Sequence, residues 1–84
     1  MHIYMQTPAM DEGPPRFYHL LLQQDLLGGW TVIREWGHQG ASGRVKREHH
    51  DTREHAEAVL LRLRDAQLRR GYRVVFVQGD VPPR

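Results

Sequence analysis

The residues best suited to chemistry in this chain lie in one segment, residues 28–43, with the sequence GGWTVIREWGHQGASG. In it, Trp36 is followed by glycines at every third position, Gly37, Gly40 and Gly43. An aromatic ring beside residues without side chains lets a sugar or a base approach closely and stack on the ring. Tryptophan also fills protein cores, so two interpretations of Trp36 stay open: a contact residue, or a core residue.

Basic residues on both sides of this segment add a second kind of contact. Arg34 lies two positions before Trp36, so in a strand the two side chains share a face. Arginine and lysine side chains bind phosphate groups, and such contacts position a protein on a nucleic acid. The candidate nucleic-acid-binding residues are therefore Arg34, Trp36, Gly37, His38, Gly40, Arg44, Lys46 and Arg47.

The other reactive side chains do not form a catalytic or metal-binding pattern. Ser42 is the only serine, cysteine is absent, and the carboxylates are scattered. His50 and His55 are one residue further apart than the i, i+4 spacing of metal ligands on a helix, which favours solvent-facing histidines. We therefore expect no enzyme activity, no catalytic residues, no metal and no cofactor.

Two strands and a turn are predicted to position Trp36. Residues 30–36 are rich in aromatic and β-branched side chains, as is typical of a strand. Residues 17–23 have well-filled apolar faces on both sides, which indicates a strand inside the sheet. Residues 25–29 form the turn of an antiparallel hairpin. Trp30, at the start of its strand, is assigned to the core.

The remaining elements follow from charge and periodicity. Residues 44–49 form a polar strand whose charges suit a sheet edge. A helix is predicted over residues 53–70, with Thr52 as N-cap and Gly71 after its end. Its buried stripe consists of Ala56, Val59, Leu60 and Leu63. Residues 72–77 form a last, apolar strand.

This order of elements predicts an α+β fold: a small antiparallel sheet with one long helix packed on one face. We expect a single domain over residues 16–77. Residues 1–15 form an N-terminal tail, with a short edge strand at Ile3, Tyr4 and Met5, and residues 78–84 form a C-terminal tail.

Composition limits the classes of protein that fit. The chain has 84 residues, a net charge of +2 and no cysteine, which excludes a disulfide scaffold and a Cys-based zinc site. The N-terminus has no signal-peptide pattern, and no apolar run approaches the roughly 20 residues that span a bilayer. We therefore expect a cytoplasmic protein without a membrane partner or a small-molecule substrate.

The order and spacing of these motifs over residues 16–73 resemble the WGR domain, named for a Trp-Gly-Arg signature. The signature stands here as Trp36-Gly37-His38. The resemblance extends to Phe17-Tyr18 before it and to Gly71-Tyr72 after the helix. It implies the same α+β architecture.

The resemblance also implies a function. In the poly(ADP-ribose) polymerases, the tryptophan of the WGR domain packs against the terminal sugar at a DNA break, and the arginine of the signature docks the domain onto neighbouring domains. Here that arginine is His38, and a histidine that is neutral at pH 7 is a poor substitute for a guanidinium. The resemblance therefore carries over the sugar contact at Trp36 and leaves the docking role open.

These observations predict a stand-alone, non-catalytic nucleic-acid-binding module that recognises DNA ends or nicks in DNA repair and binds them weakly by itself. The alternative is a protein–protein interaction module that uses the same Trp36 surface. Tryptophan and arginine are also the favoured anchor residues of protein interfaces.

Overall fold

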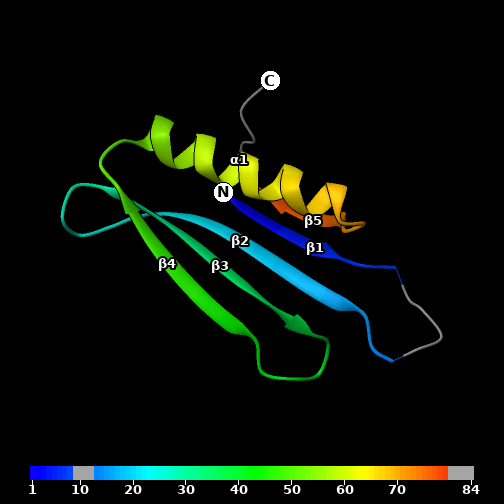
Figure 1. The fold of residues 1–84 in the computed structure, drawn as a ribbon. Helices are drawn as coiled ribbons and strands as arrows, with labels where there is room; N and C mark the ends of the chain where they lie inside the picture. Colours follow the sequence, from blue (N-terminus) through cyan, green and yellow to red (C-terminus); the bar gives the residue numbers. More distant parts are fainter. Residues whose placement is uncertain (9–12, 80–84) are drawn as a thin grey trace.

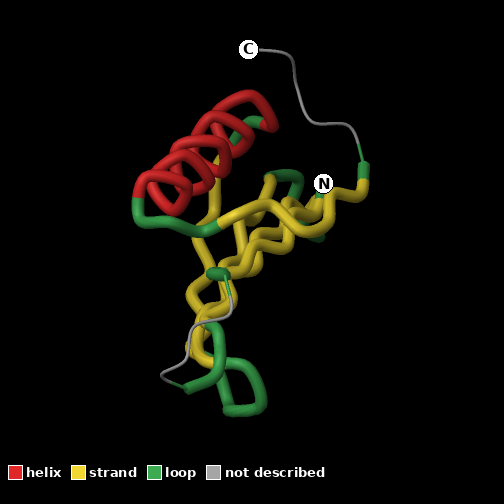
Figure 2. Tube along the Cα trace, turned by 90° about the vertical axis from the view of Figure 1, so that its right-hand side faces the viewer, coloured by secondary structure: helices red, strands yellow, loops and turns green. Residues whose placement is uncertain are grey.

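The computed structural model describes residues 1–8 and 13–79. These residues form β1 (His2–Gln6), β2 (Arg16–Gln24), β3 (Trp30–His38), β4 (Arg44–His50), α1 (Arg53–Arg69) and β5 (Arg73–Gln78). The strands make one sheet in the order β4-β3-β2-β1-β5, and every neighbouring pair is antiparallel. The helix lies across one face of the sheet (Figure 1), and Figure 2 shows the two layers from the side. The predicted α+β fold is confirmed.

The hairpin of β2 and β3 is the centre of the sheet, as predicted. Tyr18, Leu20 and Leu22 alternate along β2 and are all buried against the helix side. The Asp25 carboxylate closes the turn by accepting hydrogen bonds from the backbone N–H groups of Leu27 and Gly29, both at 2.9 Å. The Gly29 bond in particular holds the pKa of Asp25 below its ordinary value.

The position of β1 corrects the prediction of an edge strand at Ile3, Tyr4 and Met5. The strand exists but lies inside the sheet, between β2 and β5. Ile3 and Met5 are fully buried because they pair with Leu20 and Tyr18 on the helix side. A pattern of so few residues can predict a strand but not which strands lie beside it in the sheet. The position of β1 depends on its pairing with β5, about 70 positions further along the chain.

The two edges of the sheet are β4 and β5. The edge position of β4 was predicted from its charges and is confirmed. The apolar strand over residues 72–77 is also confirmed, as β5, and it occupies the other edge, where its side chains are exposed.

Local signals define both ends of α1. The Thr52 hydroxyl accepts a hydrogen bond from the N–H of His55 at 3.1 Å, as expected of an N-cap. At the other end Gly71 has φ +95°. The N–H groups of Gly71 and Tyr72 donate to the carbonyls of Leu68 and Gln67, which is the Schellman motif. This motif turns the chain sharply, so that Tyr72 points back toward the sheet.

The core lies between α1 and the sheet and consists of Ile3, Met5, Tyr18, Leu20, Leu22, Val32, Ala56 and Leu60. Val59 and Leu63 pack against it and are partly buried. Trp30 packs against the core, as predicted, but so does Trp36, and neither is among the buried core residues. Trp30 is half-buried, and the Arg53 guanidinium covers its ring at 5.2 Å from the centroid. In the described part of the chain, no helix is long and apolar enough to cross a membrane.

Candidate nucleic-acid interface

Trp36 lies near the end of β3 on the helix-facing side of the sheet. Its cross-strand neighbours are Tyr18 on β2 and Arg44 on β4. The Trp36 ring stacks on the Tyr18 ring, with centroids 5.9 Å apart and planes at 19°. The side chain is half-buried. One side of the indole is therefore packed, and the rest remains accessible to a ligand.

Arg34 extends this aromatic pair toward the middle of the sheet. It shares the face of Trp36, and its guanidinium carbon lies 5.5 Å from the Trp36 ring centroid. It also donates a hydrogen bond of 3.4 Å to the Tyr18 hydroxyl. Because this acceptor is a neutral hydroxyl, the contact does not compensate the positive charge of Arg34 beside the Trp36 ring.

The end of α1 completes the aromatic cluster. Tyr72 follows the Schellman motif, and its ring meets Tyr18 edge-on at 5.9 Å. On the helix, Gln67 is buried, and its carbonyl accepts the N–H of Tyr72. The helix end is thus fixed over Tyr18 beside Trp36.

A groove opens between the end of α1 and the ends of β2 and β3, and we call it the Trp36 groove. It is lined from the strands by Arg16, Tyr18, Arg34, Trp36, Gly37 and His38. The helix and the chain after it contribute Leu63, Ala66, Gln67, Leu68, Arg70, Gly71, Tyr72 and Arg73. The chain between β1 and β2 contributes Thr7, Pro8, Gly13 and Pro14. Aromatic and basic side chains from four separate segments thereby line one concave surface.

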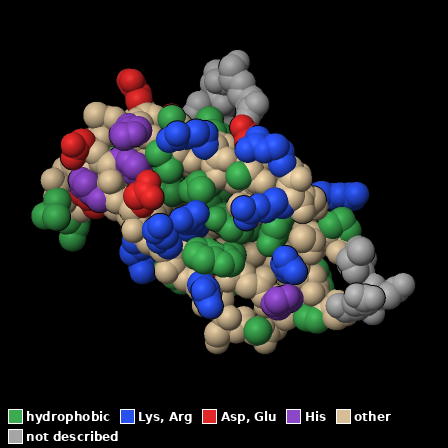
Figure 3. All heavy atoms as spheres, viewed as in Figure 1, with side chains coloured by type: hydrophobic (Ala, Val, Ile, Leu, Met, Phe, Trp, Pro, Cys, Tyr) green, Lys and Arg blue, Asp and Glu red, His purple; other side chains and the backbone are tan. Residues whose placement is uncertain are grey.

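The described residues that line the Trp36 groove carry charge of one sign only. Its lining contains four arginines and no Asp or Glu among the described residues. In Figure 3 the visible acidic side chains gather mainly at the end of the molecule where α1 begins, whereas Lys and Arg surround the hydrophobic surface beside the helix. A cleft lined by charge of one sign attracts counter-charged ligands. The groove is therefore suited to an anion with a flat or sugar-like group.

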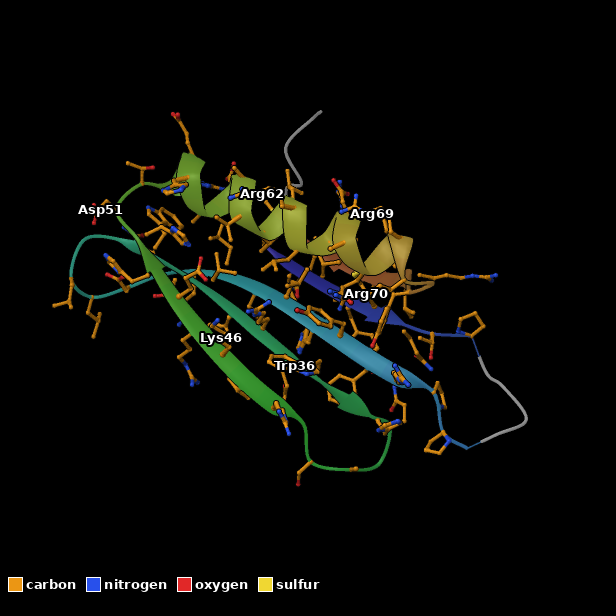
Figure 4. All side chains as sticks on the ribbon, viewed as in Figure 1. Trp36, Lys46, Asp51, Arg62, Arg69 and Arg70 are labelled. Atoms are coloured by element: carbon orange, nitrogen blue, oxygen red, sulfur yellow. The ribbon has the colours of Figure 1, made fainter. Side chains whose placement is uncertain are left out.

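The predicted basic residues of β4 separate onto two faces. Arg44 and Lys46 pair directly with Trp36 and Arg34, so they share the face of the groove. Arg47 pairs with Ile33 and lies on the other face of the sheet, beside Leu26 and Leu27. Figure 4 labels Lys46 on β4 and Trp36 on the neighbouring strand β3. Of the eight predicted residues, four line the Trp36 groove: Arg34, Trp36, Gly37 and His38. Arg44 and Lys46 share its face of the sheet without lining it, whereas Gly40 does not line it and Arg47 lies on the other face.

Glycine is required at the positions after Trp36 for different structural reasons. Gly40 has φ +82°, which side chains rarely adopt, and nothing lies within 4 Å of the position of a Cβ there. Gly37 and Gly43 pack on one another: a Cβ added to Gly43 would lie 2.9 Å from both Phe17 and the Trp36 carbonyl. Positive φ therefore explains Gly40, whereas close packing explains Gly37 and Gly43.

The histidines fall into three groups, one of which is the pair His2 and His19 on β1 and β2. His38 is exposed at the end of β3, pairs with Arg16 and lines the Trp36 groove. His49, His50 and His55 lie at the opposite end of the sheet. There, His49 bonds to Asp25 at 2.7 Å and His50 to Glu48 at 2.8 Å. Within the described residues, no three His, Cys, Asp or Glu side chains are grouped to hold a metal ion.

Sequence reasoning missed the part of the groove that does not come from β3. Arg16 begins β2, while Arg70 and Arg73 flank Gly71 after the helix. One signal was present: Arg-Arg-Gly-Tyr-Arg at residues 69–73 combines basic and aromatic residues, like the segment around Trp36. Only the tertiary fold shows that the two segments meet.

Comparison with known proteins gives one family. The WGR domain family model matches residues 1–77, and so includes all six elements up to Val77 in β5. No curated protein matches the chain.

Proposed function

Because this chain belongs to the WGR domain family, a family of nucleic-acid-binding modules in poly(ADP-ribose) polymerase-like proteins, we propose that it binds nucleic acid through the Trp36 groove and prefers DNA ends or nicks. This proposal rests on the side chains that line the groove. Aromatic rings and four arginines line it, without an acidic side chain among the described residues. We propose further that this recognition serves DNA repair and that the protein acts in the cytoplasm.

The preference for ends follows from what the Trp36 ring can reach. Within an intact duplex, the sugars are flanked by neighbouring nucleotides on both sides. At an end or a nick, the terminal sugar has one open side. The accessible part of the half-buried Trp36 ring packs on that sugar, while the packed side rests on Tyr18. Stacking on an aromatic side chain contributes about 1–3 kcal/mol per base in single-stranded complexes.

The basic residues hold the phosphates on either side of that sugar. Arg34 stands beside Trp36, and Arg44 and Lys46 continue the same face onto β4. Arg70 and Arg73 approach from the helix side of the groove. Contacts of this kind fix the position of a duplex without reading its sequence. Binding is therefore sensitive to salt and indifferent to base composition.

The WGR domain is a non-catalytic binding domain, and we propose that this chain has no enzyme activity of its own.

A rival function uses the same surface to dock on a protein. Leu68, 43% exposed at the rim of the groove, favours this rival, because an apolar side chain contributes little to phosphate binding.

The test is a titration of labelled DNA of one sequence in three forms: a covalently closed duplex without ends, a nicked duplex and a blunt-ended duplex. Fluorescence anisotropy at several salt concentrations measures the affinity for each form. We expect the nicked and blunt forms to bind about tenfold more tightly than the closed form, the ratio that 1.4 kcal/mol of stacking gives.

Equal affinity for all three forms would show that the groove binds duplex DNA without recognising ends. Absence of binding to any form at low salt, together with a co-purifying protein that shields Trp36 from a fluorescence quencher, would establish the protein-docking function instead.

A further inference from the structure

Two histidines meet on the face of the sheet opposite α1, which we call the open face. His2 begins β1 and His19 lies in β2, and the pairing of these strands places the two residues at diagonally neighbouring positions. Their Nε2 atoms face one another, and the centroids of the two rings lie 4.2 Å apart. The residues are 17 positions apart in the sequence, so the pairing of β1 with β2 is what brings them together.

Aromatic neighbours on the open face orient both imidazole rings. The ring of Phe76 on β5 meets His2 edge-on, and the ring of Tyr4 on β1 meets His19 edge-on, each with centroids 5.6 Å apart and planes at 77°. Edge-to-face contact is a preferred geometry of aromatic pairs. Both histidines are partly exposed, so a small ion can reach them from the solvent.

The other ring nitrogen of His19 favours the tautomer that metal binding requires. His19 pairs across the sheet with Glu35 on β3, and its Nδ1 atom lies 3.9 Å from a carboxylate oxygen of Glu35. A carboxylate attracts the imidazole proton to the nitrogen that it faces, and the Nε2 atom then keeps a free lone pair. The same arrangement of carboxylate and histidine orients the histidine ligands of metal sites. His19 therefore directs a lone pair toward His2.

We propose that His2 and His19 together bind a divalent transition-metal ion of the kind that prefers imidazole, such as Zn²⁺, through their Nε2 atoms. Two nitrogen atoms that bind one tetrahedral ion at about 2.0–2.1 Å lie about 3.3 Å apart. His2 is the first residue of β1 and is partly exposed, so its ring can adjust to that separation. Among the described residues no group of three His, Cys, Asp or Glu side chains could hold a metal ion, so water completes the coordination.

The bound ion joins β1 to β2 through side chains, in addition to the backbone hydrogen bonds between the strands. Because β1 lies between β2 and β5 in the sheet, this link also strengthens the attachment of β5. The two histidines are close together only in the folded chain, so the ion raises the free energy of unfolding. The open face lies opposite the face of the Trp36 groove, and the proposal does not depend on the nucleic-acid function.

Isothermal titration calorimetry of the full chain, without an affinity tag and after treatment with a chelator, tests the site. We expect one Zn²⁺ per chain, tighter binding of Cu²⁺ and no binding of Mg²⁺. Glu35→Gln should weaken Zn²⁺ binding about tenfold, because it removes the group that orients His19. His2→Gln and His19→Gln each remove a ligand, so each should weaken binding by at least about tenfold.

His55→Gln is the matched control for these variants. The rings of His50 and His55 also lie close together, with centroids 4.7 Å apart, at the other end of the sheet. There the Nε2 atom of His50 already contacts the Glu48 carboxylate at 2.8 Å. His55→Gln should therefore leave the Zn²⁺ affinity unchanged, and far-UV circular dichroism checks the fold of every variant.

NMR spectra of the histidine side chains give a second measurement, which needs no variant. Zn²⁺ should shift the Nε2 resonances of His2 and His19 and leave those of His38 in place. Zn²⁺ should also raise the Tm of the wild type but not that of His19→Gln.

Three outcomes would overturn the proposal. The first is that the wild type binds neither Zn²⁺ nor Cu²⁺ with a dissociation constant below about 1 mM. The second is that folded His19→Gln binds Zn²⁺ as tightly as the wild type, because the ion is then held without His19. The third is that binding is lost in His55→Gln, which would place the ion at the other end of the sheet.

Discussion

At the scale of single residues, the two tryptophans differ in the charge beside them more than in burial. Both are half-buried, and both have an arginine over the ring. Arg53 over Trp30 is paired with Glu57 at 2.6 Å, so its charge is compensated. Arg34 beside Trp36 donates to a neutral hydroxyl. This difference favours Trp36 over Trp30 as the residue for which we propose ligand contact.

The first prediction concerns the Trp36 ring. Trp36→Leu keeps an apolar group on Tyr18 but removes the flat surface on which a sugar stacks. The preference for nicked or blunt-ended duplex over closed duplex should fall by about 1–3 kcal/mol, while the affinity for closed duplex changes little. Anisotropy titrations measure the preference, and circular dichroism confirms the fold. If the preference survives, another group recognises the end.

The second prediction compares two neighbouring cations of β4. Lys46→Gln removes a charge from the face of the groove, and Arg47→Gln removes one from the opposite face. The slope of log affinity against log salt should decrease by about 0.9 for Lys46→Gln and remain unchanged for Arg47→Gln. Equal effects of the two substitutions would mean that DNA contacts the sheet elsewhere.

The third prediction concerns His19, on the open face of the sheet. Burial, and then the adjacent His2, hold the pKa of His19 below 6.5, although Glu35 at 3.9 Å opposes the shift. The folded state therefore binds the proton less readily than the unfolded state. The stability that His19 contributes is complete above pH 6.5. It is lost as the pH falls through the pKa of His19 in the folded state.

His19→Gln should reduce this loss. Urea unfolding at pH 7.5 and pH 5.5 measures it: the free energy of unfolding should decrease more on acidification in the wild type than in the variant. His38→Gln, which changes an exposed histidine of the groove, is the matched control. An identical decrease in wild type and His19→Gln would assign the pH dependence to other groups.

At the scale of elements, β1 is a central strand whose importance exceeds its length. It joins β5 to the rest of the sheet, and its two inward side chains, Ile3 and Met5, are fully buried. Without it, β5 has no neighbour and Leu20 loses its cross-strand partner. The first six residues are therefore part of the domain core.

The fourth prediction tests this role of β1. Deleting residues 1–6 should leave a chain that does not fold, and Ile3→Ala should cost about 2–5 kcal/mol, a large part of the stability of so small a domain. Gln6→Ala, at the end of the same strand, should change stability by less than about 0.5 kcal/mol. Urea unfolding compares the variants. A cooperative transition in the deleted chain would contradict the central role of β1.

At the scale of the whole molecule, the Trp36 groove exists because the helix ends above the hairpin. The Schellman motif turns the chain at Gly71, and this turn directs Tyr72 onto Tyr18 and brings Arg70 to the groove. Figure 4 labels Arg62 and Arg69 on α1 and Arg70 just after its end. Of these three residues, only Arg70 lines the groove. Arginines of one helix therefore have different surroundings.

The fifth prediction uses this difference. Arg70→Gln should weaken binding to every duplex alike and lower the salt slope by about 0.9, because a phosphate contact is lost. Arg62→Gln is the matched control, since Arg62 is exposed on the same helix and does not line the groove. The same anisotropy titrations measure both variants. If Arg62→Gln weakens binding as much, the outer side of the helix contributes to the DNA site.

Features that depend on neighbours in the chain could be predicted from the sequence. Thr52 and Gly71 define the helix because a cap acts within a few residues, and the alternation in residues 17–23 defines β2 because side chains in a strand alternate between faces. The same alternation placed Arg34 and Trp36 on one face. These local rules were enough for the α+β fold and for half of the candidate site.

Features that depend on distant residues were decided by the tertiary structure. The interior position of β1 requires its pairing with β5. The faces of Lys46 and Arg47 require the register of β4 on β3, in which a shift of one residue exchanges the two faces. The groove requires the helix end to lie over Tyr18, which joins Arg70 and Arg73 to Trp36 across more than thirty positions of sequence. Such contacts come from the packing of separately formed elements, and no short segment contains the information that specifies them.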